Sequence, residues 1–166
     1  MNAPLVLSPE SLARIDRELA KYPADERQSA VMAALTIAQD EHGWLSVETM
    51  DFVAHYLGMP PVAVYECASF YTMYHLQPVG RCKLTICTNL PCALQGANVA
   101  AEHLKKKLGI GFGETTADGE FTLKEGECFG ACGDAPVILM NNKTMLSWMT
   151  PDKIDAFVEE RTKASS

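Results

Sequence analysis

The hydrophobic pattern of the chain changes near Gly80, and this change limits the fold more than any other feature of the sequence. Before it, apolar residues recur at the three- and four-residue spacing of helices, whereas over residues 82–87 every second residue is apolar, as in a strand. Pro78 and Gly80 interrupt the helical period between the two regimes. We therefore predict an α+β protein, with an N-terminal helical bundle over residues 1–76 and an α/β domain with a mixed sheet over residues 77–166.

Four helices are predicted in the first half, because its apolar runs lie between recognisable start and stop residues. Ser8 and Ser46 are suited to N-cap positions, where a hydroxyl accepts a bond from a free backbone N–H. Gly43 and Gly58 favour the left-handed conformation that ends a helix. The predicted helices cover residues 9–21, 25–42, 47–57 and about 61–71.

The second half follows the order β-α-β-β-β-α, which predicts a small mixed sheet flanked by helices. The predicted strands cover residues 81–87, 119–124, 136–140 and 144–148, and the predicted helices cover residues 91–108 and a segment that begins at Pro151. Asn141 and Asn142 favour a tight turn with positive φ between the last two strands. The tail from about Arg161 is expected to fray.

Composition and charge exclude several classes of function. The 166 residues include 14 Lys and Arg against 21 Asp and Glu, and the net charge of −7 leaves no basic surplus to neutralise a nucleic-acid backbone. The longest apolar stretches, such as residues 137–140, fall far short of the roughly 20 residues that a membrane span needs. The N-terminus lacks the basic start and apolar core of a secretion signal. We therefore expect a soluble cytoplasmic protein that binds no nucleic acid and inserts into no membrane.

Six cysteines are a strong enrichment for a cytoplasmic protein, in which structural disulfides are rare. Four of them, Cys87, Cys92, Cys128 and Cys132, form the pattern C-x4-C-x35-C-x3-C. Soft thiolates select zinc or iron-sulfur clusters, and four cysteines without a histidine suit a 2Fe-2S cluster while leaving zinc open. No side chain is expected to act as a catalytic acid, base or nucleophile.

Other residues with reactive or aromatic side chains have simpler explanations. Cys67 and Cys82 are expected to pack as small apolar residues, and the side chain of Cys82 points to the opposite face of its strand from the first motif cysteine. Phe70, Tyr71 and Tyr74 recur at helical spacing and are expected to lie in a core.

The cysteine pattern, followed by Gly-Asp-Ala-Pro at residues 133–136, resembles that of the thioredoxin-like 2Fe-2S ferredoxins. The helical half, with Ala-Ser-Phe-Tyr at 68–71 and Gln-Pro-Val-Gly at 77–80, is similar to the family of E subunits of bacterial NADH-quinone oxidoreductase, the respiratory complex I. The resemblance thus covers nearly the whole chain. It implies a thioredoxin-like second domain, in which the peptide bond before Pro136 can be cis.

The resemblance also implies a cofactor and partners. It implies one 2Fe-2S cluster, with Cys87, Cys92, Cys128 and Cys132 as its ligands. FMN and NADH are expected on a partner, the flavoprotein of the same complex, next to a larger iron-sulfur protein, and not on this chain. The chain is then expected to be an electron-transfer subunit of NADH:quinone oxidoreductase, without a complete active site of its own. Through the assembled complex it is expected to lie on the cytoplasmic side of the inner membrane.

Three alternatives share the cysteines. A zinc-stabilised scaffold would use them without redox function, and a free-standing ferredoxin would have little use for the helical half. The homologous subunit of NAD-reducing hydrogenases or NAD-linked formate dehydrogenases resembles the chain in both fold and ligands. Metal analysis separates the zinc scaffold from the others, and the subunits that accompany the chain separate the different assemblies.

Overall fold

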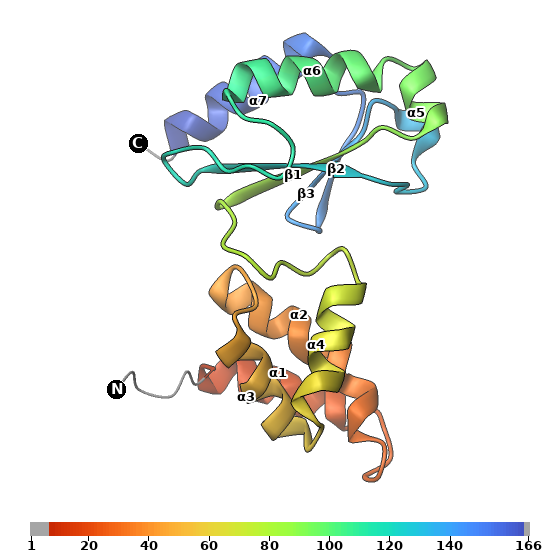
Figure 1. Ribbon diagram of the computed structural model, residues 1–166. Coiled ribbons are helices and arrows are strands. Elements are labelled where there is room, and N and C mark those ends of the chain that lie inside the picture. The colour runs from red at the N-terminus through yellow and green to blue at the C-terminus, as the bar shows by residue number, and fades with distance from the viewer. Residues whose placement is uncertain (1–6, 165–166) are drawn as a thin grey trace. The chain divides into compact units, whose positions relative to one another are not determined.

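The structure is a computed structural model that describes residues 7–164 (Figure 1). The contacts between residues divide the chain into two compact units, with the boundary between Pro78 and Val79. The first unit is helical, and the second contains a four-stranded sheet with helices. The predicted α+β class is thus confirmed. Among the described helices, none is both long and apolar enough to cross a membrane.

The first unit consists of α1 (Pro9–Leu19), a 3-10 turn (Arg27–Ala30), α2 (Val31–His42), α3 (Val47–Leu57) and α4 (Pro61–Phe70). The predicted caps are present. Ser8 Oγ accepts a hydrogen bond from the backbone N–H of Ser11 at 3.2 Å. Ser46 Oγ accepts one from the N–H of Thr49 at 3.1 Å. The glycines that follow α2 and α3 have φ values of 81° and 71°, as expected for left-handed helix ends. The buried faces of the helices share one core, which includes Ile15, Leu35, Ala38, Met50, Val53, Leu57, Val64 and Ala68.

The second helix begins six residues later than predicted. In place of its first turns, the chain forms the 3-10 turn, in which the Ser29 N–H bonds to Glu26 O, three residues back, at 3.0 Å. Residues 25–29 are all polar, and Ala30 is the first buried residue of the segment. Because most helical stability comes from burying an apolar face, the regular helix starts only where such a face exists.

The prediction that Phe70 and Tyr71 lie in a core is wrong, whereas that for Tyr74 is confirmed. Phe70 is 77% exposed and Tyr71 is 39% exposed, while Tyr74 is 5% exposed. The buried face of α4 is formed by Val64 and Ala68, and Phe70, two positions beyond Ala68, points about 200° around the helix from it. Helical spacing therefore did not place Phe70 and Tyr71 on the buried face.

The second unit contains β1 (Cys82–Cys87), α5 (Leu90–Leu94), α6 (Ala97–Leu108), β2 (Phe121–Gly126), a 3-10 turn (Cys132–Asp134), β3 (Ile138–Met140), β4 (Thr144–Leu146) and α7 (Pro151–Ala164). The strand order is β2-β1-β3-β4, with β1 and β2 parallel and the other neighbours antiparallel, so the predicted mixed sheet is confirmed. The helices α6 and α7 lie together over one face of the sheet (Figure 1). Their shared core includes Leu84, Leu104, Leu123 and Ile154.

The single helix predicted over residues 91–108 is two helices. Gly96 interrupts it with a φ of 89°, and its N–H bonds to Ala93 O, three residues back, at 3.0 Å. A left-handed residue cannot continue an α-helix, and only glycine adopts this conformation without a steric cost. The break separates the short α5 from the longer α6.

The ends of the predicted strands shift by at most two residues, and β1 is more deeply buried than predicted. The alternating pattern of residues 82–87 predicts one buried face, but Lys83 and Cys87 on the other face are only 4% and 1% exposed. Cys87 is covered because it packs with Cys92, Ala97 and Val137. At the other end of the chain, α7 continues past the predicted fraying point to Ala164.

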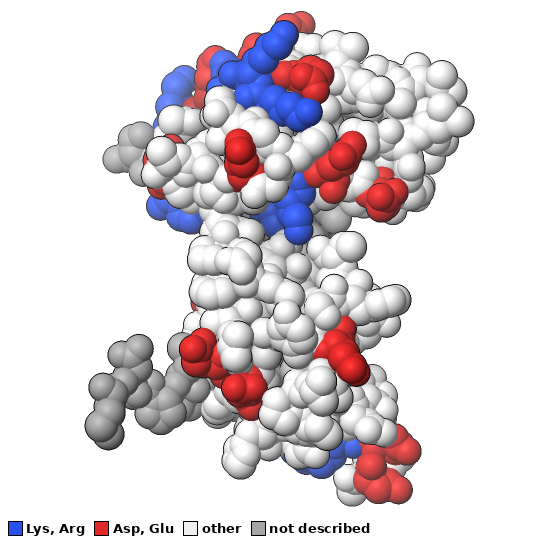
Figure 2. Space-filling view, viewed as in Figure 1, with Lys and Arg blue, Asp and Glu red and all other residues white. Residues whose placement is uncertain are grey.

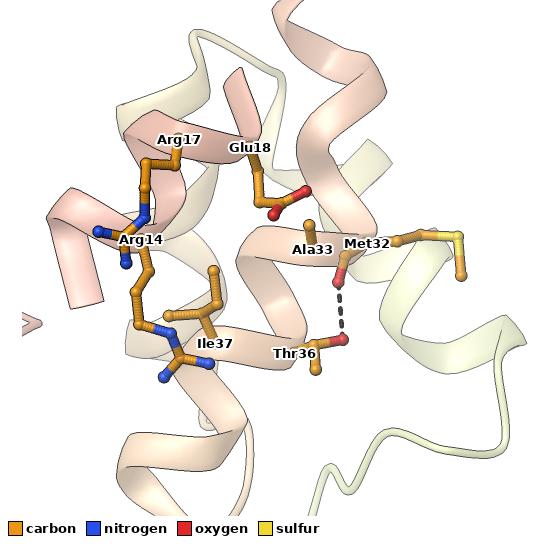
Figure 3. Close-up of a pocket in the computed structure, with 7 residues that line it drawn as sticks. All are labelled: Arg14, Arg17, Glu18, Met32, Ala33, Thr36 and Ile37. Carbon is orange, nitrogen blue, oxygen red and sulfur yellow. Dashed lines mark hydrogen bonds between the residues drawn. The ribbon is translucent and has the colours of Figure 1, made fainter. Parts of the chain in front are cut away.

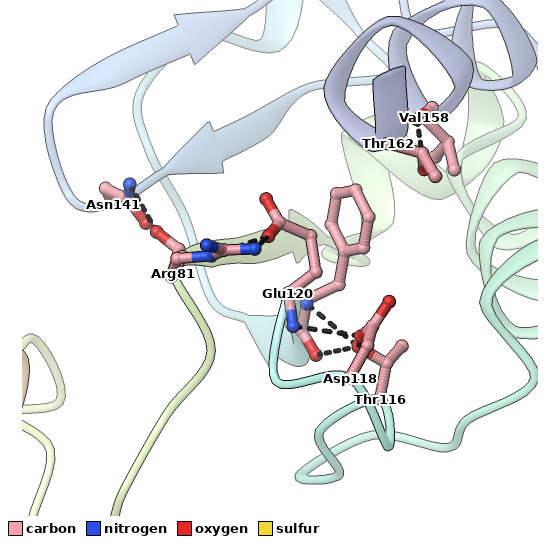
Figure 4. A network of polar contacts seen from close by, with 8 residues as sticks. Arg81, Thr116, Asp118, Glu120, Asn141, Val158 and Thr162 are labelled. Atoms are coloured by element: carbon pink, nitrogen blue, oxygen red, sulfur yellow. Dashed lines mark hydrogen bonds and ion pairs between the residues drawn. The ribbon is translucent and has the colours of Figure 1, made fainter. Parts of the chain in front are cut away.

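Polar contacts hold the start of β1 to both neighbouring strands. Asn141 and Asn142 form the predicted turn with φ values of 51° and 56°. The Asn141 side chain accepts a bond from the Lys83 N–H at 2.7 Å and donates one to Arg81 O at 3.1 Å. On the other side, Arg81 Nε donates to the Glu120 carboxylate at 2.7 Å (Figure 4). Because Glu120 is 7% exposed, its pairing with Arg81 satisfies a charge that would otherwise be costly to bury.

Candidate metal centre

Regular structure brings Cys87 and Cys92 together. Cys87 is the last residue of β1, where its N–H donates to Val137 O at 3.2 Å. Cys92 lies in the first turn of α5 and packs in the same buried cluster as Cys87. Both residues are 1% exposed and pack with Ala97 and Val137. The chain thus holds these two thiols inside a small apolar cluster.

Cys128 and Cys132 lie in the irregular segment between β2 and β3, and both are exposed. Gly130, between them, has a φ of 71°, and its N–H donates to Cys128 Sγ at 3.3 Å. Such backbone donors to sulfur are one means by which proteins tune a bound iron-sulfur cluster. The peptide bond before Pro136, which follows this segment, is cis.

The surroundings of Cys92 raise the pKa of its thiol. Burial is the largest of the causes that raise the pKa of Cys92 to about 11. Cys87, Cys132 and Cys128 also raise this pKa, through a hydrogen bond or through their charges. The fold brings the two stretches near each other, because Phe129 and Ala131, between Cys128 and Cys132, pack against the buried cluster that contains Cys87 and Cys92. All six cysteines are free thiols.

The chemistry of the four residues fits a metal centre bound by thiolates. Among residues 7–164, no three His, Cys, Asp or Glu side chains already stand in a metal-binding arrangement. The exposed pair lies in the segment between β2 and β3. The carboxylate of Asp134 in this segment accepts a hydrogen bond from Ser147 Oγ at 3.0 Å. An all-sulfur donor set matches zinc and 2Fe-2S centres, which bind thiolates.

Cys67 and Cys82 lie elsewhere and pack as small apolar residues. Cys82 begins β1, five residues before Cys87, which corresponds to about 16 Å along a strand. It belongs to the core of the sheet, and burial raises its pKa to about 11. Cys67 packs against the helical core of the first unit, and burial raises its pKa as well.

A hollow of about 400 Å³ lies between α1 and α2 of the first unit (Figure 3). It is lined by Arg14, Arg17, Glu18, Met32, Ala33, Thr36 and Ile37. Arg14 lies 3.5 Å from the carboxylate of Asp40, and Thr36 Oγ1 donates to Met32 O at 2.9 Å. None of the lining residues is a cysteine or a histidine, so the hollow has no part in the thiol chemistry.

The surface next to Cys92 is uncharged and apolar, a feature that the sequence patterns did not lead us to predict. Leu90 and Leu94, on either side of Cys92 in α5, are 72% and 78% exposed. No charged residue occurs between positions 84 and 101, and the surface over α5 is correspondingly white in Figure 2. The run of uncharged residues is the sequence signal from which this surface could have been predicted. Exposed apolar side chains beside a functional site are typical of a protein interface.

Comparison with known proteins identifies the family. Residues 15–162 match the family described as thioredoxin-like 2Fe-2S ferredoxin. The chain belongs to this family. It is 39% identical over 152 residues to the NADH-quinone oxidoreductase E subunit of Rickettsia bellii. The aligned region covers 91% of this chain and 90% of that protein. It is 49% identical over 124 residues to the NADH-quinone oxidoreductase E subunit designated E 2 of Rhizobium meliloti, which covers 75% of this chain and 73% of that protein.

Two further relatives are longer than this ferredoxin-family chain. It is 40% identical over 166 residues, 99% of its length, to the mitochondrial NADH dehydrogenase (ubiquinone) flavoprotein 2 of Dictyostelium discoideum, of which it spans 62%. An NAD+-reducing NiFe-hydrogenase in its H2-reduced state has a similar fold, with a TM-score of 0.68 at 22% identity. That likeness covers 78% of this chain and 22% of the hydrogenase chain.

We expect Gly126→Ala to disturb the segment that carries Cys128 and Cys132. A Cβ at Gly126 would lie 2.6 Å from the ring of Phe129 and 2.7 Å from the methyl group of Thr85, closer than real Cβ contacts. Displacing Phe129 would shift this segment, and such overpacking costs about 1–3 kcal/mol. A lower urea midpoint and a smaller retained amount of metal per chain are the expected results.

Gly133→Ala is the matched control for this prediction. A Cβ at Gly133 meets nothing within 4 Å, and its φ is not positive. Its urea midpoint and metal content should equal those of the wild type. If both alanine variants behave alike, the packing of Phe129 on Gly126 does not position the segment.

Proposed function

We propose that Cys87, Cys92, Cys128 and Cys132 hold one 2Fe-2S cluster, through which the chain carries electrons in the NADH-oxidising part of an NADH-quinone oxidoreductase. The observation that supports this most directly is the convergence of the two cysteine pairs, since Phe129 and Ala131, which lie between Cys128 and Cys132, pack against the cluster that contains Cys87 and Cys92. The membership in a family of 2Fe-2S ferredoxins favours this cluster over zinc.

The residues of the chain have separate tasks in this proposal. When bound, a 2Fe-2S cluster takes up and releases single electrons. Cys87 and Cys92 anchor it from β1 and α5, in surroundings that exclude water. Cys128 and Cys132 complete the ligand set from the segment after β2, and the Gly130 N–H stabilises negative charge on the Cys128 sulfur. No residue has to act as an acid or a base, because no proton transfer is required for electron transfer.

The electrons are exchanged with the FMN of a partner, the flavoprotein that binds NADH, in a complex that also includes a larger iron-sulfur protein. The names of the relatives from Rickettsia bellii and Rhizobium meliloti support this assignment, since both are E subunits of an NADH-quinone oxidoreductase. In this arrangement the chain lies at the cytoplasmic side of the inner membrane and is held there by the other members of the complex.

A homologous subunit of an NAD-reducing hydrogenase is the second candidate, favoured by the similar fold of the hydrogenase structures. The 22% identity of that comparison supports the fold alone. The 39% and 49% identities to the two E subunits favour the quinone-linked assembly.

Reduction by NADH tests the proposed function. We would express the full chain alone and together with the flavoprotein encoded in the same genome, and add NADH without oxygen. Dithionite should reduce the cluster in both samples, whereas NADH should reduce it only in the sample that contains the flavoprotein. Reduction by NADH of the chain alone, or no effect of the flavoprotein, would contradict the proposal.

We expect Leu94→Glu to weaken binding to the flavoprotein without affecting the cluster. Leu94 is 78% exposed beside Cys92, so the change leaves the core intact but places a charge on the uncharged surface. Losing an apolar contact at the centre of an interface costs about 1–3 kcal/mol, or roughly ten- to hundredfold in affinity. The dissociation constant, together with the iron content of the variant, measures the effect.

Val47→Glu is the control for Leu94→Glu. Val47 is 61% exposed and is the first residue of α3, where an acidic side chain suits the helix dipole. Its affinity for the flavoprotein should be that of the wild type. If Leu94→Glu binds as tightly as this control, the surface over α5 is not the docking site.

A further inference from the structure

The four proposed ligands form two pairs that differ in how the chain holds them. The inner pair, Cys87 and Cys92, lies in a strand and a helix, and each of its members is 1% exposed. The outer pair, Cys128 and Cys132, is exposed and lies in the segment between β2 and β3. The difference comes from the elements in which the residues lie. A molecule that approaches the site from solvent therefore meets the outer pair first.

The segment that carries the outer pair is tied to the fold at both ends. Before it, Gly126 O accepts a bond from the Thr88 N–H at 3.5 Å. After it, Asp134 O accepts a bond from the Trp148 N–H at 2.7 Å. Between these points the segment has no strand pairing, and Cys128 and Gly130 are exposed. Between its ends the segment also packs against the inner pair, through Phe129 and Ala131.

We propose that a preassembled 2Fe-2S cluster enters the site through the outer pair, an inference that rests on the proposed cluster site. Cys128 and Cys132 bind the cluster first, while it is still held by the thiolates of its donor. Cys87 and Cys92 then replace the remaining donor thiolates. The donor is thus a carrier that holds the cluster through thiolates that solvent can reach, because a buried cluster could not meet the outer pair.

Each step is an exchange of sulfur ligands on iron. One Fe–S bond to a chain cysteine forms as one Fe–S bond to a donor thiolate breaks. The chain thiol gives up its proton, and the departing donor thiolate takes up a proton. No electron is transferred, so the cluster keeps its oxidation state and no oxidant or reductant is needed.

Cluster transfer to single variants of the full chain tests this order. The donor is a 2Fe-2S cluster held by glutathione thiolates, and its transfer is followed by visible absorbance and circular dichroism after rapid mixing. Cys128→Ser and Cys132→Ser should slow the first phase by about tenfold, since the thiols that meet the donor are missing. Cys87→Ser and Cys92→Ser should leave the first phase unchanged and remove the second. Slowing of the first phase by the inner-pair variants alone, or by all four variants equally, would overturn the proposal.

Alkylation of the wild-type chain gives a second readout that needs no variant. Cluster-free chain would receive a short pulse of iodoacetamide, and the modification of each cysteine would be measured by mass spectrometry. Cys128 and Cys132 should react about tenfold faster than Cys87 and Cys92, because thiol reactivity depends on exposure. Buried Cys82 provides the internal standard for slow reaction. Equal rates for the two pairs would contradict the inferred order.

The outcomes also separate this inference from the proposed function. If the wild-type chain takes up no 2Fe-2S cluster from the donor, both proposals fail. If it takes up the cluster but the inner pair reacts first, the proposed function stands and only the entry order is wrong.

Discussion

Replacing Cys92 with serine is expected to leave a folded chain that holds almost no iron. Cys92 is 1% exposed and packs in the same buried cluster as Cys87, so its sulfur is firmly positioned. A serine hydroxyl is a much poorer ligand for iron than a thiolate and fills almost the same space. Iron and acid-labile sulfide per chain should fall to a small fraction of the wild-type values, while the far-ultraviolet circular dichroism stays unchanged.

Cys67→Ser is the control for this result. Cys67 is partly buried in the helical unit and belongs to no cysteine pair, so the variant should contain as much iron as the wild type. Loss of iron from Cys67→Ser together with normal iron in Cys92→Ser would show that the assigned ligands are wrong.

Leu84→Ala is expected to cause a large loss of stability in the second unit. Leu84 is completely buried in β1, the strand that pairs with both β2 and β3, and lies opposite Leu123 and Met140 in the sheet. Truncating a buried leucine removes apolar contacts and leaves a cavity, at a cost of about 2–5 kcal/mol. Urea unfolding of the full chain, followed through the sheet unit, should show a correspondingly lower midpoint. Because β1 also ends in Cys87, the variant should release its cluster at a lower urea concentration.

Val99→Ala is the matched control in the same unit. Val99 is 65% exposed on α6, and alanine is the better helix former, so stability should change by no more than about 0.5 kcal/mol. A loss of stability in Val99→Ala as large as that in Leu84→Ala would mean that burial in the sheet core does not determine the stability of this unit.

Local signals predicted much of the fold. Ser8, Ser46, Gly43 and Gly58 mark helix ends because each satisfies a backbone requirement that depends on its immediate neighbours alone. The turn at Asn141 and Asn142 is predictable for the same reason, since few residues accept positive φ. Alternation of apolar residues located β1 to within one residue of its start.

The wrong predictions concern residues whose structure depends on packing against parts of the chain far away in the sequence. Residues 25–29 have a helical sequence pattern around them but no apolar side chain to bury, so the regular helix starts later. Phe70 has the spacing of a core residue, but the core of the first unit faces Val64 and Ala68. Gly96 is left-handed and interrupts the helix that was predicted over residues 91–108. A glycine inside an apolar pattern does not by itself show whether a helix continues through it.

Spacing and residue type were sufficient to nominate Cys87, Cys92, Cys128 and Cys132, because soft-metal chemistry requires thiolates in close pairs. Spacing and residue type were not sufficient to show that the two pairs converge. Convergence depends on the parallel pairing of β1 with β2. This pairing places Cys87 opposite Gly126, two residues before Cys128. The unequal burial of the two pairs, and the exposed Leu90 and Leu94 beside them, likewise follow only from the three-dimensional fold.

The most direct test of the cluster is metal and sulfide analysis of the purified full chain, combined with electron paramagnetic resonance. We expect a brown protein with equal amounts of iron and acid-labile sulfide, and a paramagnetic signal that appears on reduction and is lost in Cys92→Ser. A colourless protein that contains stoichiometric zinc and no sulfide would contradict it.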